Sequence, residues 1–156
     1  KKVVAFVETL FREGYIGNVL VSTGKLSGSE YLKSAATAAK QSQHASRIYF
    51  SFDEATENAV ADVVNTLNGF TSKSAYGIGI SAISPKEFHS QIRSASELEK
   101  NGTINFTYVW TLDKDSSMER YLFEDGARGI LTNNPSVLKA VFEKHKCSLV
   151  VPGGAL

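Results

Sequence analysis

Residues 106–111, Phe-Thr-Tyr-Val-Trp-Thr, form a short apolar run that ends in a small polar residue. Four further runs have the same character and lie at residues 18–22, 47–51, 76–81 and 129–133. In chain order, the first four runs end 29 to 30 residues apart. This spacing matches the roughly 30 residues of a β-strand with its helix, and near-continuous apolar runs are typical of buried parallel strands. The repeat therefore predicts successive β-α units and a parallel sheet.

Helix signals fill the intervals between these runs. We expect helices over residues 3–13, 30–43 and 53–68, and three more that begin near residues 84, 116 and 134. All but the first begin with a residue whose side chain can accept an unpaired backbone N–H. These expected caps are Ser27 with Glu30, Asp53, Ser84, Ser116 and Asn134. The first helix has no strand ahead of it, which is unusual for an α/β protein.

Five strands are compatible with two α/β architectures. One is a self-sufficient, doubly wound five-stranded sheet of the flavodoxin type. The other is a part of a βα barrel, which needs eight strands and about 250 residues. The periodicity alone leaves both open. No linker or change of composition divides residues 1–156, so we expect a single domain or a part of one.

Composition and charge exclude several classes of protein. The 17 basic and 16 acidic side chains give a net charge of +1, which argues against a nucleic-acid partner because such binding needs a basic surface. No apolar run reaches the ~18 residues of a membrane span. The single cysteine, Cys147, excludes an intrachain disulfide and is interpreted as a free thiol or a link to another chain. The chain begins with Lys1 and Lys2, so we expect a processed product or a fragment.

Two N-glycosylation sequons lie four residues apart, at Asn101 and Asn105. They leave secretion as one of two open possibilities.

Several other residue types are interpreted without a functional role. The three histidines have no second histidine or carboxylate at metal-ligand spacing, so we expect them at the surface: His44, His89 and His145. Gly77 and Gly79 lie inside an apolar run rather than before a helix. They are therefore predicted to allow close packing in a strand, not to bind phosphate.

The strongest candidate site lies at the carboxyl ends of the predicted strands, where parallel α/β folds bind ligands. This rim would hold Ser22, Ser51, Asp53, Ser81, Trp110, Asp113 and Asn133. Tyr108 and Trp110 are two residues apart and should point to the same side of their strand. Aromatic faces beside the Asp113 carboxylate are suited to a quaternary ammonium group. The alternative is that the two rings fill a core and Asp113 starts a loop.

Two segments resemble a known family. Residues 108–114, Tyr-Val-Trp-Thr-Leu-Asp-Lys, are similar to the seventh-strand motif of the spider-venom sphingomyelinase D (phospholipase D) toxins. Residues 125–135, Asp-Gly-Ala-Arg-Gly-Ile-Leu-Thr-Asn-Asn-Pro, are similar to their eighth strand and the loop before it. The wider glycerophosphodiester phosphodiesterase superfamily has a similar pair but usually differs at the positions of Asp113 and Asn133.

The resemblance is specific over residues 104–142 and looser over residues 1–103. In the looser part, Ser22 and Ser81 match serines of the family's pocket. The family tends to have Asp-x-Ser where this chain has Ser51 and Asp53, so the two residue types are exchanged.

The resemblance implies a TIM-type (β/α)8 barrel that cleaves choline phospholipids, such as sphingomyelin or lysophosphatidylcholine, with one Mg²⁺ ion. Tyr108, Trp110, Asp113 and Asn133 match pocket residues that hold the head group. It also implies that two catalytic histidines and the metal ligands lie on the first three barrel strands, which this chain lacks.

We therefore expect the C-terminal five βα units of a barrel, inactive alone and completed by a missing N-terminal portion or a second chain. We further expect a secreted protein that contacts membranes at most peripherally. The alternative is a non-catalytic binding or storage protein on the same scaffold.

Overall fold

A computed structural model describes residues 2–80 and 87–147 and contains one parallel sheet. Its five strands are β1 (Val19–Thr23), β2 (Ile48–Phe52), β3 (Ser74–Gly79), β4 (Phe106–Trp110) and β5 (Gly129–Ile130). Each strand pairs in parallel with the next one along the chain, so the spatial order is β1-β2-β3-β4-β5. All five predicted strands are confirmed in the described residues, with ends shifted by up to three residues.

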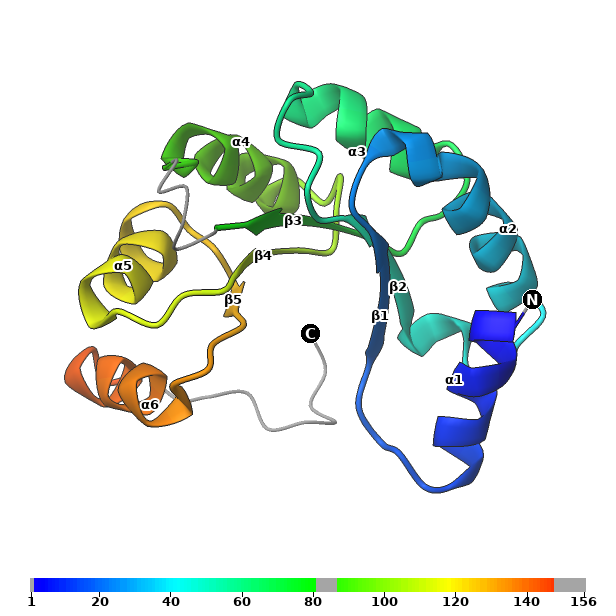
Figure 1. The fold of residues 1–156 in the computed structure, drawn as a ribbon, viewed down its shortest axis with the longest axis horizontal. Helices are drawn as coiled ribbons and strands as arrows, with labels where there is room; N and C mark the ends of the chain where they lie inside the picture. The colour runs from blue at the N-terminus through cyan, green and yellow to red at the C-terminus, as the bar shows by residue number, and fades with distance from the viewer. Residues whose placement is uncertain (1, 81–86, 148–156) are drawn as a thin grey trace.

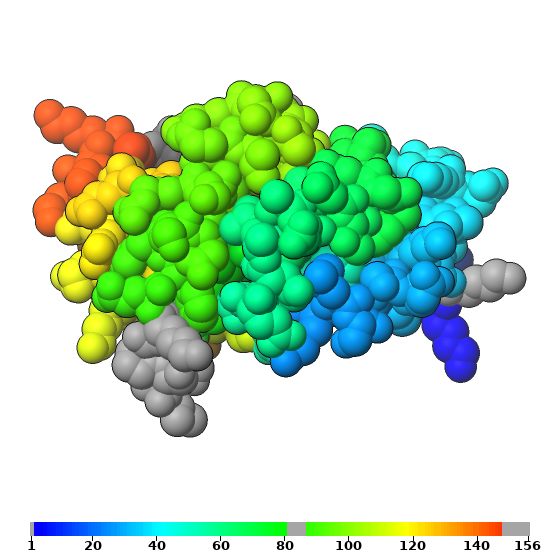
Figure 2. Space-filling view, turned by 90° about the horizontal axis from the view of Figure 1, so that it is seen from above, coloured from blue at the N-terminus to red at the C-terminus, as the bar shows by residue number. Residues whose placement is uncertain are grey.

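Six α-helices lie along the convex side of the curved sheet (Figure 1). They are α1 (Lys2–Arg12), α2 (Ser29–Ala39), α3 (Val60–Asn68), α4 (His89–Lys100), α5 (Asp115–Glu119) and α6 (Pro135–Lys144). Short 3₁₀ turns, η1 (Leu26–Gly28) and η2 (Ala45–Arg47), and a π-helical segment, η3 (Arg120–Glu124), complete the layer. Seen from above, the N-terminal segments lie at one end of the molecule and the C-terminal helix α6 lies at the other (Figure 2). None of the helices in the described part of the chain is long and apolar enough to cross a membrane.

The strand order decides between the two architectures that the sequence left open. A doubly wound sheet reverses its strand order at a switch point and carries helices on both faces. In this sheet the order never reverses, and the helices cover one face only (Figure 1). The doubly wound alternative is therefore wrong, and the arrangement is that of consecutive units of a βα barrel.

The core lies between the convex face of the sheet and the helices. Alternate strand residues point toward the helices and are almost completely buried: Ile48, Phe50, Phe52, Tyr76, Ile78 and Val109. The helices contribute matching apolar side chains, among them Leu32, Val63, Leu67 and Ile92. Each fully buried side chain of this size contributes about 1.5–3 kcal/mol to folding. The helix layer therefore fixes the strands, and the opposite face of the sheet is left to carry the site.

Two predicted helix starts are wrong. Ser27 does not cap a helix, because it lies inside the 3₁₀ turn that precedes α2. Asp53 does not cap α3, which begins only at Val60. The backbone of Asp53 is instead held between two strands, since its N–H donates to Thr23 (3.1 Å) and its carbonyl accepts from Gly79 (3.0 Å).

The last two helices follow the prediction more closely. Asn134 and Pro135 begin α6 as expected, although the Asn134 side chain makes no capping bond. Helix α5 begins at Asp115, one residue before the expected Ser116. The expected start at Ser84 lies outside the described residues.

Candidate functional site

Tyr108 and Trp110 lie on the concave face of β4, opposite two glycines of the neighbouring strand β3. In the parallel ladder, Tyr108 pairs with Gly77 and Trp110 with Gly79. A methyl group at Gly77 would lie 2.1 Å from the Tyr108 ring, and one at Gly79 would lie 2.6 Å from the Trp110 ring. The glycines therefore leave the space that the two rings occupy. This confirms their predicted packing role and places both aromatic rings side by side on one face.

Ser22, Ser51 and Asp53, at the carboxyl ends of β1 and β2, form an inner cluster with Tyr108 from the middle of β4. Ser22 and Ser51 are partners in the β1–β2 ladder. Burial raises the pKa of Asp53, and the nearby Ser22 hydroxyl opposes part of that effect. Burial also raises the pKa of Tyr108, with the Asp53 charge adding to the effect and Ser51 opposing it. Ser22 and Ser51 therefore lie close enough to affect the pKa values of Asp53 and Tyr108.

This cluster contains buried polar atoms that have no partner. The hydroxyls of Ser51 and Tyr108 are neighbours, yet neither meets full hydrogen-bond geometry within the described part of the chain. The indole Nε1 of Trp110 is likewise buried without a partner among the described residues. Buried donors normally find a partner, because an unpaired one costs about 1–3 kcal/mol. All three atoms can donate to a ligand oxygen.

Asp113 and Asn133 join the loops that follow β4 and β5. The backbone N–H of Asn133 donates to one carboxylate oxygen of Asp113 (2.8 Å), and its side-chain amide donates to the other (3.1 Å). The Thr132 hydroxyl adds a third bond at 3.1 Å. These bonds, with the Asn133 side chain first, lower the pKa of Asp113. These bonds therefore favour the ionised form of an exposed carboxylate at the rim, three residues beyond Trp110.

The structure brings together most, but not all, of the predicted rim. The inner cluster and the Asp113–Asn133 pair are two separate groups, because no hydrogen bond or ion pair joins them among the described residues. Trp110 lies on β4, whose carboxyl end leads to Asp113. Ser81 lies outside the described residues.

The rim does not have the composition of a metal site. Within residues 2–80 and 87–147, no three His, Cys, Asp or Glu side chains gather where they could hold a metal ion. Its carboxylates, Asp53 and Asp113, belong to the two different groups described above. The residues that the structure describes therefore do not fit Mg²⁺.

The predicted modification sites lie elsewhere. Asn101 follows α4 and Asn105 precedes β4, so both are at the amino end of the strand whose other end carries Trp110. Cys147 is an exposed free thiol after α6.

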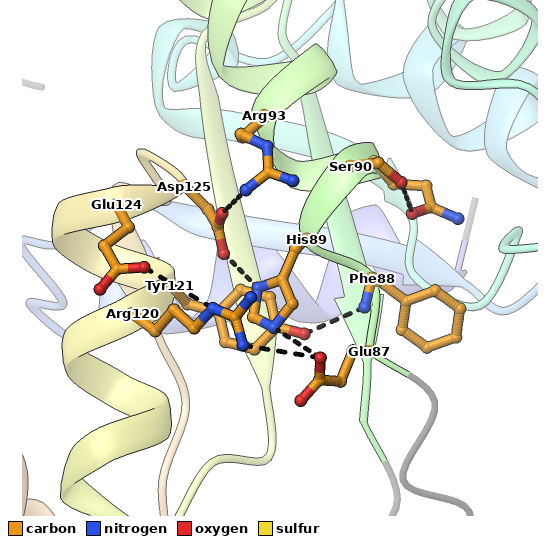
Figure 3. A network of polar contacts seen from close by, with 10 residues as sticks. Glu87, Phe88, His89, Ser90, Arg93, Arg120, Tyr121, Glu124 and Asp125 are labelled. Carbon is orange, nitrogen blue, oxygen red and sulfur yellow. Dashed lines mark hydrogen bonds and ion pairs between the residues drawn. The ribbon is translucent and has the colours of Figure 1, made fainter.

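The prediction that His89 lies at the surface is wrong, because the structure shows its side chain buried. The sequence reasoning therefore missed the polar network around it. Its ring Nδ1 contacts Asp125, whose side chain is fully buried and also accepts a bond from Arg93 (2.7 Å). The ring stacks on Tyr121 with centroids 4.4 Å apart. The Tyr121 hydroxyl in turn accepts the backbone N–H of Phe88 (3.1 Å), as Figure 3 shows.

This network connects the first turn of α4 to the turn that leads into β5. Asp125 precedes β5, and β5 leads directly to the loop that holds Asn133. The network therefore fixes the segment that positions the Asp113–Asn133 pair. The only sequence signal was Asp125 itself, the first residue of the second family motif.

Comparison with known proteins agrees with this architecture. The dermonecrotic toxin SPH family matches residues 3–150 of the 156. A dermonecrotic toxin of Loxosceles intermedia, LiSicTox-alphaII1, is 41% identical over 56 residues, which are 35% of this chain and 18% of that protein. This chain is therefore about half as long as that relative. The family match confirms the resemblance drawn from the two motifs: the chain belongs to the dermonecrotic toxin SPH family, the sphingomyelinase D toxins.

Proposed function

We propose that this chain is the C-terminal portion of a secreted phospholipase D-type phosphodiesterase acting on choline phospholipids such as sphingomyelin or lysophosphatidylcholine. In this proposal it supplies the side of the site that binds the head group. The observation that carries the proposal is the position of Tyr108 and Trp110 side by side on the concave face, with the charged Asp113 beyond the end of their strand. Family membership supplies the reaction class.

The chemistry of these residues suits a phosphocholine group. A trimethylammonium ion has no N–H to donate, so it is held by aromatic faces and by nearby negative charge. Trp110, which is partly exposed, offers the aromatic face beside the buried Tyr108 ring, and Asp113 and Asp53 offer the charge. The unpartnered hydroxyls and the indole N–H offer donors for phosphate oxygens. Fixing the head group in this way would orient the phosphodiester for cleavage.

The acid–base groups and the metal are assigned to another part of the protein. As the family resemblance implies, we expect the Mg²⁺ ligands and the two catalytic histidines outside this chain. The metal would stabilise charge on the phosphate when bound there. The residues of this chain bind and orient the substrate.

A companion polypeptide, carrying the first three barrel strands, is supported by the exposed concave face. A pocket of about 270 Å³ opens on this face and is lined by apolar side chains that include Leu20, Tyr49, Phe106 and Leu131. Leu131 is 54% exposed. The strands at the two ends of the sheet, β1 and β5, each lack a neighbour on one side among the described residues. Unpaired edges and exposed apolar faces are usually covered. The Loxosceles intermedia toxin is about twice as long as this chain, so it has additional residues that can cover such surfaces.

The test is release of choline from sphingomyelin vesicles by the natively purified protein, together with any chain that copurifies. We expect Trp110→Ala to reduce turnover at low lipid concentration, and Trp110→Phe to retain part of it because an aromatic face remains. Vesicles of phosphatidylserine, which lack the quaternary ammonium group, serve as the control, and with them the release of serine is measured.

Two outcomes would contradict the proposal. One is choline release that is unaffected by Trp110→Ala. The other is saturable phosphocholine binding with no hydrolysis by any copurified assembly, which would favour the non-catalytic binding protein instead.

A further inference from the structure

The first sequon is fully accessible in the folded chain. Asn101 directly follows helix α4, and Asn101, Gly102 and Thr103 are all exposed. Gly102 has a φ of +79°, so the chain turns sharply away from the helix here. The Asn101 side-chain oxygen accepts the backbone N–H of Thr103 (3.1 Å) and also contacts its hydroxyl. No hydrogen bond within the described residues uses the side-chain nitrogen, Nδ2, which is the atom that N-linked sugars occupy.

The second sequon is built into the sheet. Thr107 is completely buried on β4, and its hydroxyl and backbone N–H both donate to Glu99 (2.9 and 2.8 Å). The side-chain oxygen of Asn105 is buried, and its backbone N–H donates to Ser74 of the neighbouring strand (2.8 Å). The ring between them, Phe106, packs edge-on against Tyr49 at a centroid distance of 5.3 Å. A glycan on Asn105 would have to displace these contacts.

We propose that Asn101, and not Asn105, carries an N-linked glycan in the folded, secreted protein. The inference rests on the secretion that is part of the proposed function. In the transfer, a bond forms between Nδ2 of Asn101 and C1 of an N-acetylglucosamine. The C1–oxygen bond of a lipid-linked oligosaccharyl diphosphate breaks, the diphosphate leaves with the electron pair, and the proton lost from Nδ2 passes to a base.

The position of Asn101 keeps such a glycan away from the site. Asn101 precedes the amino end of β4, whereas Trp110 ends the strand. A five-residue strand spans about 17 Å. A sugar chain that extends into solvent from this end therefore leaves the rim open to a lipid surface.

The test is expression of the chain behind a secretory signal in insect cells, with Asn101→Gln and Asn105→Gln as matched variants. Secreted protein is treated with peptide N-glycosidase F, and intact and peptide masses are recorded. We expect one glycan on the unaltered chain and on Asn105→Gln, none on Asn101→Gln, and an aspartate at position 101 after treatment. Thr103→Ala removes the same sequon by a different change and should also abolish the glycan.

A glycan on Asn105, or secreted protein that carries no glycan, would overturn this inference. The result is independent of catalysis. Phosphocholine binding by the natively purified protein can be measured before and after removal of the glycan, so failure of the glycan assignment and failure of the proposed function are separate outcomes.

Discussion

The substitution Gly79→Ala tests the position of Trp110 most sharply. The added methyl group would lie 2.6 Å from Cζ2 of the indole and 2.9 Å from two further atoms of the same ring, so the ring must move. Forcing extra volume into a packed position costs typically about 1–3 kcal/mol of stability. A displaced ring also loses its cation–π contribution of about 0.5–2 kcal/mol, which corresponds to a loss of phosphocholine affinity of about 2- to 30-fold.

The assay can follow the ring directly, because Trp110 is the only tryptophan in the chain. Its fluorescence is titrated with phosphocholine for the unaltered chain, Gly79→Ala and the control Gly129→Ala. A methyl group at Gly129 would be 3.7 Å from its nearest neighbour, Cβ of Tyr108, which is an ordinary contact. We expect a shifted emission maximum and weaker binding for Gly79→Ala, and little change for Gly129→Ala. Unchanged emission and affinity in Gly79→Ala would refute the packing argument.

Three further predictions concern the charged groups. Asp125→Ala removes a buried, paired carboxylate and should lower the free energy of unfolding, measured in urea, by about 3 kcal/mol. The control Glu97→Gln changes an exposed carboxylate and should alter it by less than about 0.5 kcal/mol. Equal losses for the two variants would contradict this prediction. Head-group affinity should rise with pH through the raised pKa of Asp53 as its carboxylate ionises, and Asp53→Asn should flatten that step; an unaltered profile would count against its role. The Asp113 contacts, formed by the ionised group, should stabilise the fold above the ordinary carboxyl pKa of about 4 and lose that effect as pH falls through its lowered value; an ordinary carboxyl pKa by NMR would argue against them.

The strands and one side of the site could be predicted from local sequence. Apolar runs located β1 to β5, the first four of them at even spacing, because burial of a parallel strand leaves a continuous apolar signature. The two-residue period of a strand placed Tyr108 and Trp110 on one face.

The wrong predictions depended on contacts between distant segments. Asp53 has the residue type of a helix cap, but its backbone bonds to Thr23 and Gly79. His89 has one local partner, Glu87 (3.4 Å), but its buried partner is Asp125, 36 residues away. Spacing along the chain carries no information about such pairs.

The central claim is that this chain binds a choline head group through Trp110. Its most direct test is a titration of Trp110 fluorescence with phosphocholine, using the natively purified species and any companion chain it retains. The account predicts a saturable change that tetramethylammonium competes for, that phosphoserine does not produce, and that Asp113→Asn weakens. A signal that stays flat, or that responds equally to phosphoserine, would contradict it.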